Sequence, residues 1–357
     1  MITAGRTIVI VAATALACGG EPAPPPGAPP ASRARPAPAG ARPRARLDIA
    51  LDSDATWVAF RSPTSLLVGK DELGSARGIA EYDAATGKLL GQVVAAGGGR
   101  AALAPRAGLL AYAADTTVTV LRLADRSTVR AFGDLWASSV ALSPDGRLLA
   151  VSYAQPEDAP DIQLFDIASG KRVASMAPRG GDALPYDSGF RLQVAFSSDG
   201  RRLAALLAND TPAEAELSVW SVPGAKREAA WPLSRSGEDE IGSAPRLGAA
   251  LAIAPDGSAV AAGDIDSAAH VFPILGGKER LLPRRGRAIT AIAFSPTGSL
   301  VAAAGENGPL ALWSLPDGRE IAMLPAPDRC SALAFSPDGA RVAAACARAV
   351  AIWQVPR

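Results

Sequence analysis

The chain has 357 residues, with 36 basic and 35 acidic side chains and a formal net charge of +1 at pH 7. Residues 1–46 hold six of the basic and one of the acidic residues, so the remainder carries a net charge of −4, which argues against a nucleic-acid-binding surface. One histidine and three cysteines leave little material for histidine-dependent catalysis or a metal centre.

The first 17 residues are predicted to be a signal peptide. Arg6 supplies a short basic region, and "TIVIVAATALA" is apolar but too short for an ordinary membrane span. The stretch ends in Ala-Leu-Ala before Cys18, which resembles the lipid-attachment box of bacterial lipoprotein precursors, although leucine usually stands one position earlier. That resemblance implies lipidation of Cys18; the alternative is an ordinary secretory signal followed by a chance cysteine.

Residues 18–46 are predicted to be a disordered tether. The segment from Gly19 to Arg46 contains nine prolines among alanines and glycines, a composition that cannot build a core and favours extended polyproline II conformations. We therefore expect an exported protein that is anchored by lipid in the bacterial cell envelope. The outer membrane is favoured because Gly19 is not the aspartate that retains enterobacterial lipoproteins at the inner membrane.

From residue 47 to residue 357 one hairpin phrase recurs, as in "LAFSPDGARVAAAC" from Leu333 to Cys346. Proline presets the second position of a turn, aspartate caps it, and glycine takes the left-handed position. Seven residues share the place of Phe335 at intervals of 39 to 57 residues: Phe60, Leu103, Leu142, Phe196, Ile253, Phe294 and Phe335. A second marker follows each of them by about twenty residues, in a predicted third strand: Tyr82, Leu121, Phe165, Trp220, Phe272, Trp313 and Trp353.

Four strands per unit at this period predict a β-propeller. The strings "LAFSPDGARVAAAC…AIWQV" and "IAFSPTGSLVAAAGENGPLALWSLPDGRE" resemble WD40 repeats, and the resemblance extends more weakly over all seven units. The histidine usual before the first strand of such repeats is absent, so the wider WD40-like or TolB-like group is the better comparison. It implies an all-β fold, namely a seven-bladed β-propeller of four-stranded antiparallel blades.

The last unit ends after its third strand, whereas "ARLDIALD" (45–52) is strand-like and has no hairpin partner of its own. Pairing this strand with the last blade satisfies both open edges. We therefore predict that an N-terminal strand completes the seventh blade of a single monomeric domain.

Cys330 and Cys346 flank the last hairpin. If Ser336 faces Ala340, then residue 334 faces 342, residue 332 faces 344, and the two cysteines lie opposite each other. Two interpretations stay open: a disulfide, which an exported protein permits, or two small buried side chains.

No catalytic constellation is evident. His270 lies on a predicted third strand without nucleophilic partners, and a structural role is expected. Asp115, Asp264, Asp266 and Glu306 fall in short turns, where carboxylates cap the backbone; gathered around a metal, as in propeller lactonases, they would instead be catalytic. We expect no cofactor and no metal.

The favoured function is non-enzymatic binding of a protein, a peptide or an envelope polymer. The alternative is a periplasmic, metal-dependent propeller hydrolase or lactonase that acts on a small ester, lactone or glycan. Excess loop length falls in blades 3 to 5, in connections that topology places on one face, and loops on a rigid scaffold commonly carry recognition. The predicted partner-binding residues are Glu157, Asp158, Arg179, Asp182, Tyr186, Asp187, Phe190, Arg235, Glu238, Asp239, Glu240 and Arg246.

Overall fold

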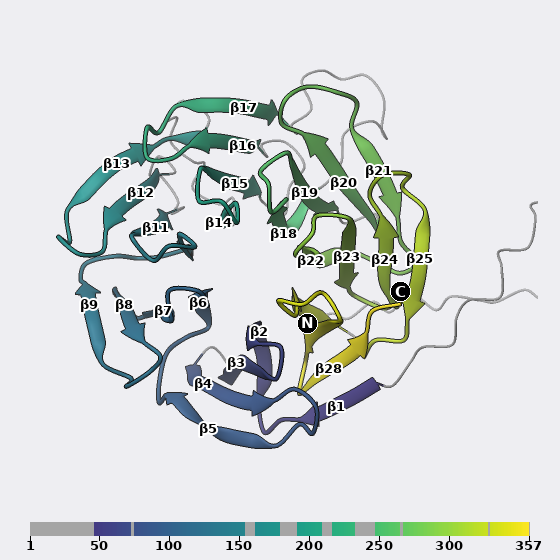
Figure 1. Cartoon of the computed structure of the whole chain (residues 1–357), viewed down its shortest axis with the longest axis horizontal. Helices are drawn as coiled ribbons and strands as arrows, with labels where there is room; N and C mark the ends of the chain where they lie inside the picture. The colour runs from purple at the N-terminus through teal and green to yellow at the C-terminus, as the bar shows by residue number, and fades with distance from the viewer. Residues whose placement is uncertain are drawn as a thin grey trace, which may run out of the picture. The chain divides into compact units, whose positions relative to one another are not determined.

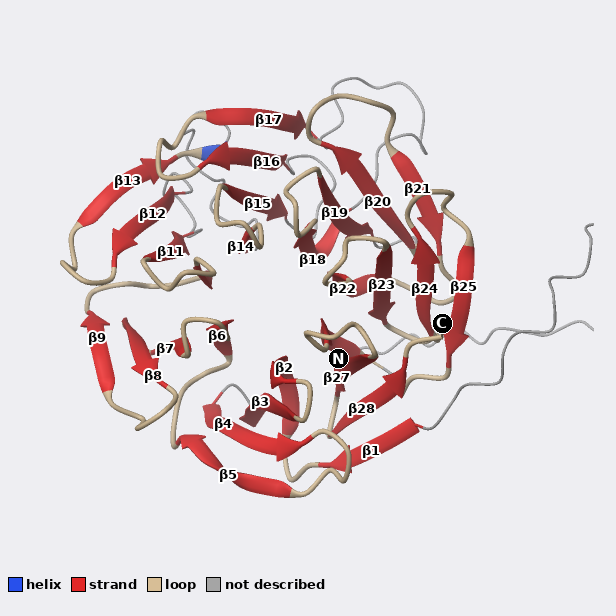
Figure 2. Cartoon of the chain, viewed as in Figure 1, coloured by secondary structure: helices blue, strands red, loops and turns tan. Residues whose placement is uncertain are grey.

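The computed structural model describes residues 46–72, 75–153, 161–178, 191–208, 216–232, 247–264, 267–327 and 329–356. This part of the chain forms seven four-stranded antiparallel sheets, and its one helical segment is a short 3-10 turn at Pro178 (Figures 1 and 2). Each sheet is a meander in which consecutive strands pair, apart from the sheet that contains both ends of the chain. The predicted seven-bladed β-propeller is therefore confirmed.

The blades follow one another in chain order, and each one runs from an inner first strand to an outer fourth strand (Figure 1). Blades 1 to 3 are β2 (Asp54–Ser62), β3 (Ser65–Glu72), β4 (Ser75–Asp83) and β5 (Leu89–Val94); β6 (Arg100–Ala104), β7 (Leu109–Ala114), β8 (Thr117–Arg122) and β9 (Thr128–Phe132); and β10 (Ser139–Leu142), β11 (Leu148–Tyr153), β12 (Asp161–Asp166) and β13 (Arg172–Met176).

Blades 4 to 7 complete the ring, and the seventh takes its outer strand from the beginning of the chain. They are β14 (Arg191–Phe196), β15 (Arg202–Ala208), β16 (Glu216–Ser221) and β17 (Arg227–Pro232); β18 (Leu247–Ile253), β19 (Ala259–Asp264), β20 (Ala268–Pro273) and β21 (Arg280–Pro283); β22 (Ile289–Phe294), β23 (Leu300–Gly305), β24 (Leu310–Ser314) and β25 (Glu320–Leu324); and β26 (Cys330–Phe335), β27 (Arg341–Cys346), β28 (Ala349–Gln354) and β1 (Arg46–Ala50).

The two sets of marker residues occupy one row of each sheet. Phe335 pairs with Val342, and Val342 pairs with Trp353. The equivalent row recurs in every blade, for example Phe294–Val301–Trp313 in blade 6. The third-strand markers are buried, and Trp353 and Trp313 are only 0% and 2% exposed. The repeated phrase therefore places a large side chain at the same depth in each blade.

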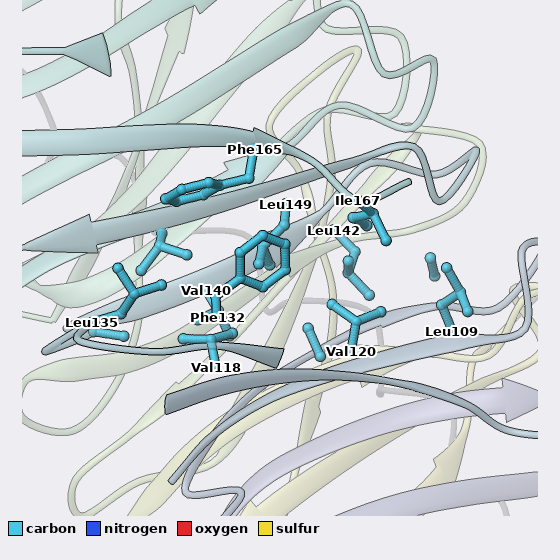
Figure 3. Packing of buried hydrophobic residues seen from close by; sticks show 14 residues of the cluster. Leu109, Val118, Val120, Phe132, Leu135, Val140, Leu142, Leu149, Phe165 and Ile167 are labelled. Atoms are coloured by element: carbon cyan, nitrogen blue, oxygen red, sulfur yellow. The ribbon is translucent and has the colours of Figure 1, made fainter. Parts of the chain in front are cut away.

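Seven apolar clusters hold the ring together, one between each pair of adjacent blades. Between blades 2 and 3, Val118 and Val120 face Val140 and Leu149, and the rings of Phe132 and Phe165 lie 5.0 Å apart (Figure 3). Alanines in the middle of the second strands, such as Ala302 to Ala304, are fully buried. Their small side chains let neighbouring sheets approach closely enough to pack.

The tight turn between first and second strands depends on its serine as well as on proline, aspartate and glycine. Ser336 is 0% exposed; its Oγ donates to Asp338 Oδ1 at 2.5 Å and accepts from the backbone N–H of Arg341 at 2.9 Å. The hydroxyl of Ser336 also keeps the pKa of Asp338 below its usual value. Gly339 follows at a φ of 68°, which favours glycine.

The ring closes as predicted, through β1 on the outer edge of blade 7 (Figure 1). Arg46 pairs with Trp353 and Ala50 with Ala349, so β1 is antiparallel to β28. Ile49 is 5% exposed and belongs to the cluster that joins blade 7 to blade 1. The N-terminal strand therefore supplies both backbone pairing and core packing at the junction.

Cys330 and Cys346 are joined by a disulfide between β26 and β27. The register leading to them differs from the predicted one. Residue 334 faces 343 and not 342, because Ser336 pairs with Arg341 and so shifts the hairpin by one residue. A β-bulge between Cys330 and Ala332 then restores the facing position of the two cysteines.

We expect the disulfide to form whenever the protein is prepared without reductant. Both cysteines are 1% exposed, so the bond is shielded from exchange in the native state. Thiol titration of the unfolded Cys18→Ser chain should then find no reactive thiol before reduction and two after it. Two thiols before reduction would show that Cys330 and Cys346 only pack against each other.

Candidate functional site

The strand order divides the connections of the propeller between two faces. We call the face with the connections between second and third strands and between blades the loop face. The turn face carries the connections between first and second strands and between third and fourth strands. The four long connections of blades 3 to 5 join β11 to β12, β13 to β14, β15 to β16 and β17 to β18, so all four start and end on the loop face. All twelve predicted partner-binding residues, and Cys18, lie outside the described residues.

At the base of the connection between β11 and β12, a polar cluster links β12 to β13 beside Tyr153 of β11. Asp161 accepts hydrogen bonds from Ser175 Oγ at 2.5 Å and from Gln163 Nε2 at 3.1 Å. Tyr153 faces Asp161 across the strand pair, and its hydroxyl is buried without a partner among the described residues. Burial, and secondarily the charge of Asp161, raises the pKa of Tyr153. The connection between β11 and β12 therefore ends at a hydrogen-bonded, partly buried strand start.

An ion pair stands at the base of the connection between β15 and β16. Glu216, the first residue of β16, is 8% exposed and lies 2.5 Å from Arg227 at the start of β17. A nearly buried carboxylate is tolerated there because a guanidinium meets it. The loops of blades 3 and 4 thus begin from well-packed strand ends.

Trp136 is a feature of the loop face that the sequence reading missed. It lies in the connection from blade 2 to blade 3 and is 64% exposed. Its neighbours Leu135 and Ala137 are 8% and 5% exposed and belong to the cluster between the two blades. The backbone N–H of Leu135 donates to Thr116 O at 2.8 Å. A large aromatic ring is therefore held outward by a firmly packed backbone, beside the blade that carries two of the long connections.

The sequence contains an indication of this role, because Trp136 belongs neither to the first-strand markers nor to the third-strand markers that build the blades. Tryptophan is among the commonest residues at interaction hot spots, and one pinned by buried neighbours loses little entropy on binding.

The turn face has a depression of about 400 Å³ over blades 2 to 4. It is lined by turn residues: Arg106, Ala107, Pro144, Asp145, Ser198, Asp199 and Gly200. This lining contains no histidine or cysteine. Asp145 already accepts a hydrogen bond from Ser143 at 2.6 Å within its own turn. The depression therefore offers a polar surface made of turn residues.

The described residues with catalytic potential that the sequence singled out lie in different blades, whereas Asp266 and the side chain of Asp264 lie outside the described residues. His270 is 6% exposed, contacts Glu279 through Nδ1 and stacks on Phe272, which is a structural environment. Asp115 lies in the turn between β7 and β8 at a φ of 49°, and Glu306 follows β23 in another turn. Across the described ranges, no three histidine, cysteine, aspartate or glutamate side chains gather as a metal site would require. In the same ranges, no helix is long and apolar enough to span a bilayer.

Comparison with known proteins agrees with this architecture. Residues 281–314 match the family model described as "WD domain, G-beta repeat". The match begins in β21, the outer strand of blade 5, and ends with β24 of blade 6, so the repeat is offset by one strand from the blade. No curated protein matches the sequence.

Among solved structures, a chain of Kuenenia stuttgartiensis hydrazine synthase has a TM-score of 0.65 and 17% sequence identity, covering 85% of this chain and 96% of that chain. At this identity the likeness concerns the fold alone. Fold and repeat together define the class: the chain is a seven-bladed β-propeller in which residues 281–314 match a WD40 repeat.

Proposed function

We propose that this protein is a membrane-anchored, non-enzymatic scaffold that binds a protein, a peptide or an envelope polymer through the loop face of blades 3 to 5. The observation that carries the proposal is the concentration of long connections there, rooted on packed strand ends, beside the exposed ring of Trp136. The turns of the opposite face are all short. Long loops on a rigid ring give a large adaptable contact area without loss of stability.

Shortening the long connections should abolish capture of the partner. We would trim residues 179–190 and 233–246 to the length found in other blades, and leave every strand intact. Crosslinking and pull-down from envelope fractions should recover a partner with the full-length chain and none with the trimmed chain, at unchanged melting temperature. A partner that binds both chains with equal affinity would move the recognition surface elsewhere. A stoichiometric metal ion in the purified protein would favour an enzyme.

A single substitution gives a milder test of the same face. Trp136→Ala should weaken partner binding about tenfold or more, since exposed tryptophans at hot spots commonly contribute about 2 kcal/mol or more. The matched control is Leu275→Ala, because Leu275 is 81% exposed and lies on the turn face. Equal affinities of the two variants would exclude Trp136 from the interface.

The anchor belongs to the same proposal and depends on Cys18. In fractionation at high salt, which screens binding by charged side chains, Cys18→Ser should move the protein from the detergent-extracted membrane fraction to the soluble fraction of the envelope, because the lipid attached to the cysteine is lost. Fractionation followed by immunoblotting measures the shift. A soluble wild-type protein would contradict lipidation.

A further inference from the structure

The direction of β1 determines the face from which the preceding chain leaves the propeller. Arg46 pairs with Trp353, in the row next to the tight turn of Ser336, whereas Ala50 pairs with Ala349 at the opposite end of β28. In five of the other blades, the third-strand marker pairs with the first residue of the fourth strand. That residue comes directly after the turn between the third and fourth strands, on the turn face. Arg46 takes this place in blade 7, so the chain that precedes it is attached at the turn face.

The turn face also carries a ring of basic side chains near its outer rim. In each of blades 1 to 6, the turn between third and fourth strands contributes one exposed lysine or arginine: Lys88, Arg126, Lys171, Lys226, Lys278 and Arg319. We call these six residues the basic ring. Apart from a loose 3.9 Å ion pair between Arg319 and Asp317, none of them makes a side-chain hydrogen bond or ion pair within the described ranges.

Other arginines of the same face have a different role, which separates them from the basic ring. Arg130 of blade 2 donates to Ile167 O and Ala168 O of blade 3, both at 2.6 Å. Arg341 of blade 7 similarly reaches Pro63 O of blade 1 at 3.0 Å. These half-buried side chains link neighbouring blades. The ring residues are solvent-exposed and are left to contact something outside the chain.

Basic residues outnumber acidic ones in the turns between third and fourth strands. The six turns from third to fourth strand, with their flanking residues (83–89, 122–128, 166–172, 221–227, 273–280 and 314–320), contain ten basic and six acidic residues. Asp83 and Asp166 each accept hydrogen bonds from the backbone of their own turn, which keeps their carboxylates turned toward the turn.

We propose that the turn face docks on an anionic phospholipid surface through the basic ring, with the loop face directed away from the bilayer. Lysine and arginine near an anionic leaflet contribute about 1 kcal/mol each, and the attraction is screened by salt. Attachment of the N-terminal chain at this same face would bring the ring to the headgroups and leave the loops of blades 3 to 5 open to a partner. The proposal deepens the proposed function and uses its lipid anchor only to choose the surface, since the ring binds lipid by itself.

The test uses the full chain with Cys18→Ser, so that no lipid anchor contributes. Co-sedimentation with vesicles of phosphatidylglycerol and phosphatidylcholine should show binding that vanishes with phosphatidylcholine alone and weakens with added salt. Replacing four ring residues, Lys88→Glu, Lys171→Glu, Lys226→Glu and Lys278→Glu, should lower the affinity about 100-fold or more.

The matched control reverses four exposed arginines of the loop face, Arg100→Glu, Arg285→Glu, Arg287→Glu and Arg348→Glu, and so has the same net charge. This control should bind the vesicles as the parent does. Equal loss in both variants, or no binding of the parent to anionic vesicles, would overturn the proposal. Partner capture by the loop face and membrane fractionation of the wild type are separate measurements, so failure of the docking surface is distinguishable from failure of the scaffold function.

Discussion

We expect a chain that lacks residues 1–52 to melt at least about 10 °C below the full chain and to aggregate on heating, because it has lost β1. Without β1, the outer edge of β28 presents unpaired backbone groups to solvent, and open edges of this kind pair with other chains. The deletion also removes Ile49 from the cluster between blades 7 and 1, and the contact of Arg46 with the ring of Trp353.

The control is a chain that lacks only residues 1–45, which keeps the whole of β1. It should melt as the full chain does. A milder variant separates the contribution of side-chain packing from that of backbone pairing. Ile49→Ala should lower the free energy of unfolding by about 2–5 kcal/mol, while the backbone hydrogen bonds between β1 and β28 remain. Calorimetry and light scattering measure both effects. Identical melting of the two deletions would mean that blade 7 is stable as three strands.

The second large effect is expected at Arg284, in the connection from blade 5 to blade 6. This side chain is 6% exposed, and burial lowers its pKa. Its Nε donates to Pro309 O at 2.9 Å and its Nη1 donates to Arg287 O at 2.9 Å. No carboxylate pairs with it among the described residues. The guanidinium therefore fastens the connection to the turn after β23 through backbone carbonyls alone.

Arg284→Ala should lower the free energy of unfolding by about 2–4 kcal/mol, because buried carbonyl groups lose a charged donor. Urea titration measures the change. The control is Arg285→Ala, which removes the same kind of side chain from an exposed neighbouring position and should change the stability by less than about 0.5 kcal/mol. Equal midpoints for the two variants would show that the carbonyls of Pro309 and Arg287 do not depend on Arg284.

The sequence predicted the architecture because its regularities are local. The proline–aspartate–glycine turns and the paired markers recur in each blade, so the row Phe335–Val342–Trp353 follows from spacing once a four-stranded meander is assumed. The partner of the N-terminal strand was also predictable, since only one blade lacked a strand. The exact register was not: the buried hydroxyl of Ser336 sets a longer turn than the one assumed, and the bulge at Cys330 has no sequence signature.

The positions of Arg284 and Trp136, which lie in connections between blades, could not be predicted either, because they depend on contacts between blades. Arg284 stands in the string "PRRGR", where an arginine ordinarily indicates a solvated loop. Its burial depends on the turn at residues 306–309, which approaches so closely that a Cβ on Gly308 would lie 2.2 Å from Arg285 O. Trp136 shows the reverse: an apolar residue that would ordinarily be buried is exposed, because its two neighbours in the chain are buried instead. Both depend on how adjacent blades meet, which no pattern within one repeat encodes.

The pairing of β1 with β28 has a consequence for the order of folding. The first strand of the propeller to be synthesised has its partner in the last one, since Arg46 pairs with Trp353. Six blades are built from contiguous segments and can form as local meanders, whereas the seventh requires both β1 and β28. Until the two pair, β1 is a strand without a sheet, and closure carries the entropy cost of joining distant segments. We therefore expect the joining of β1 to β28 to come late in folding, and a chain truncated before β28 to leave β1 and β27 with unpaired edges.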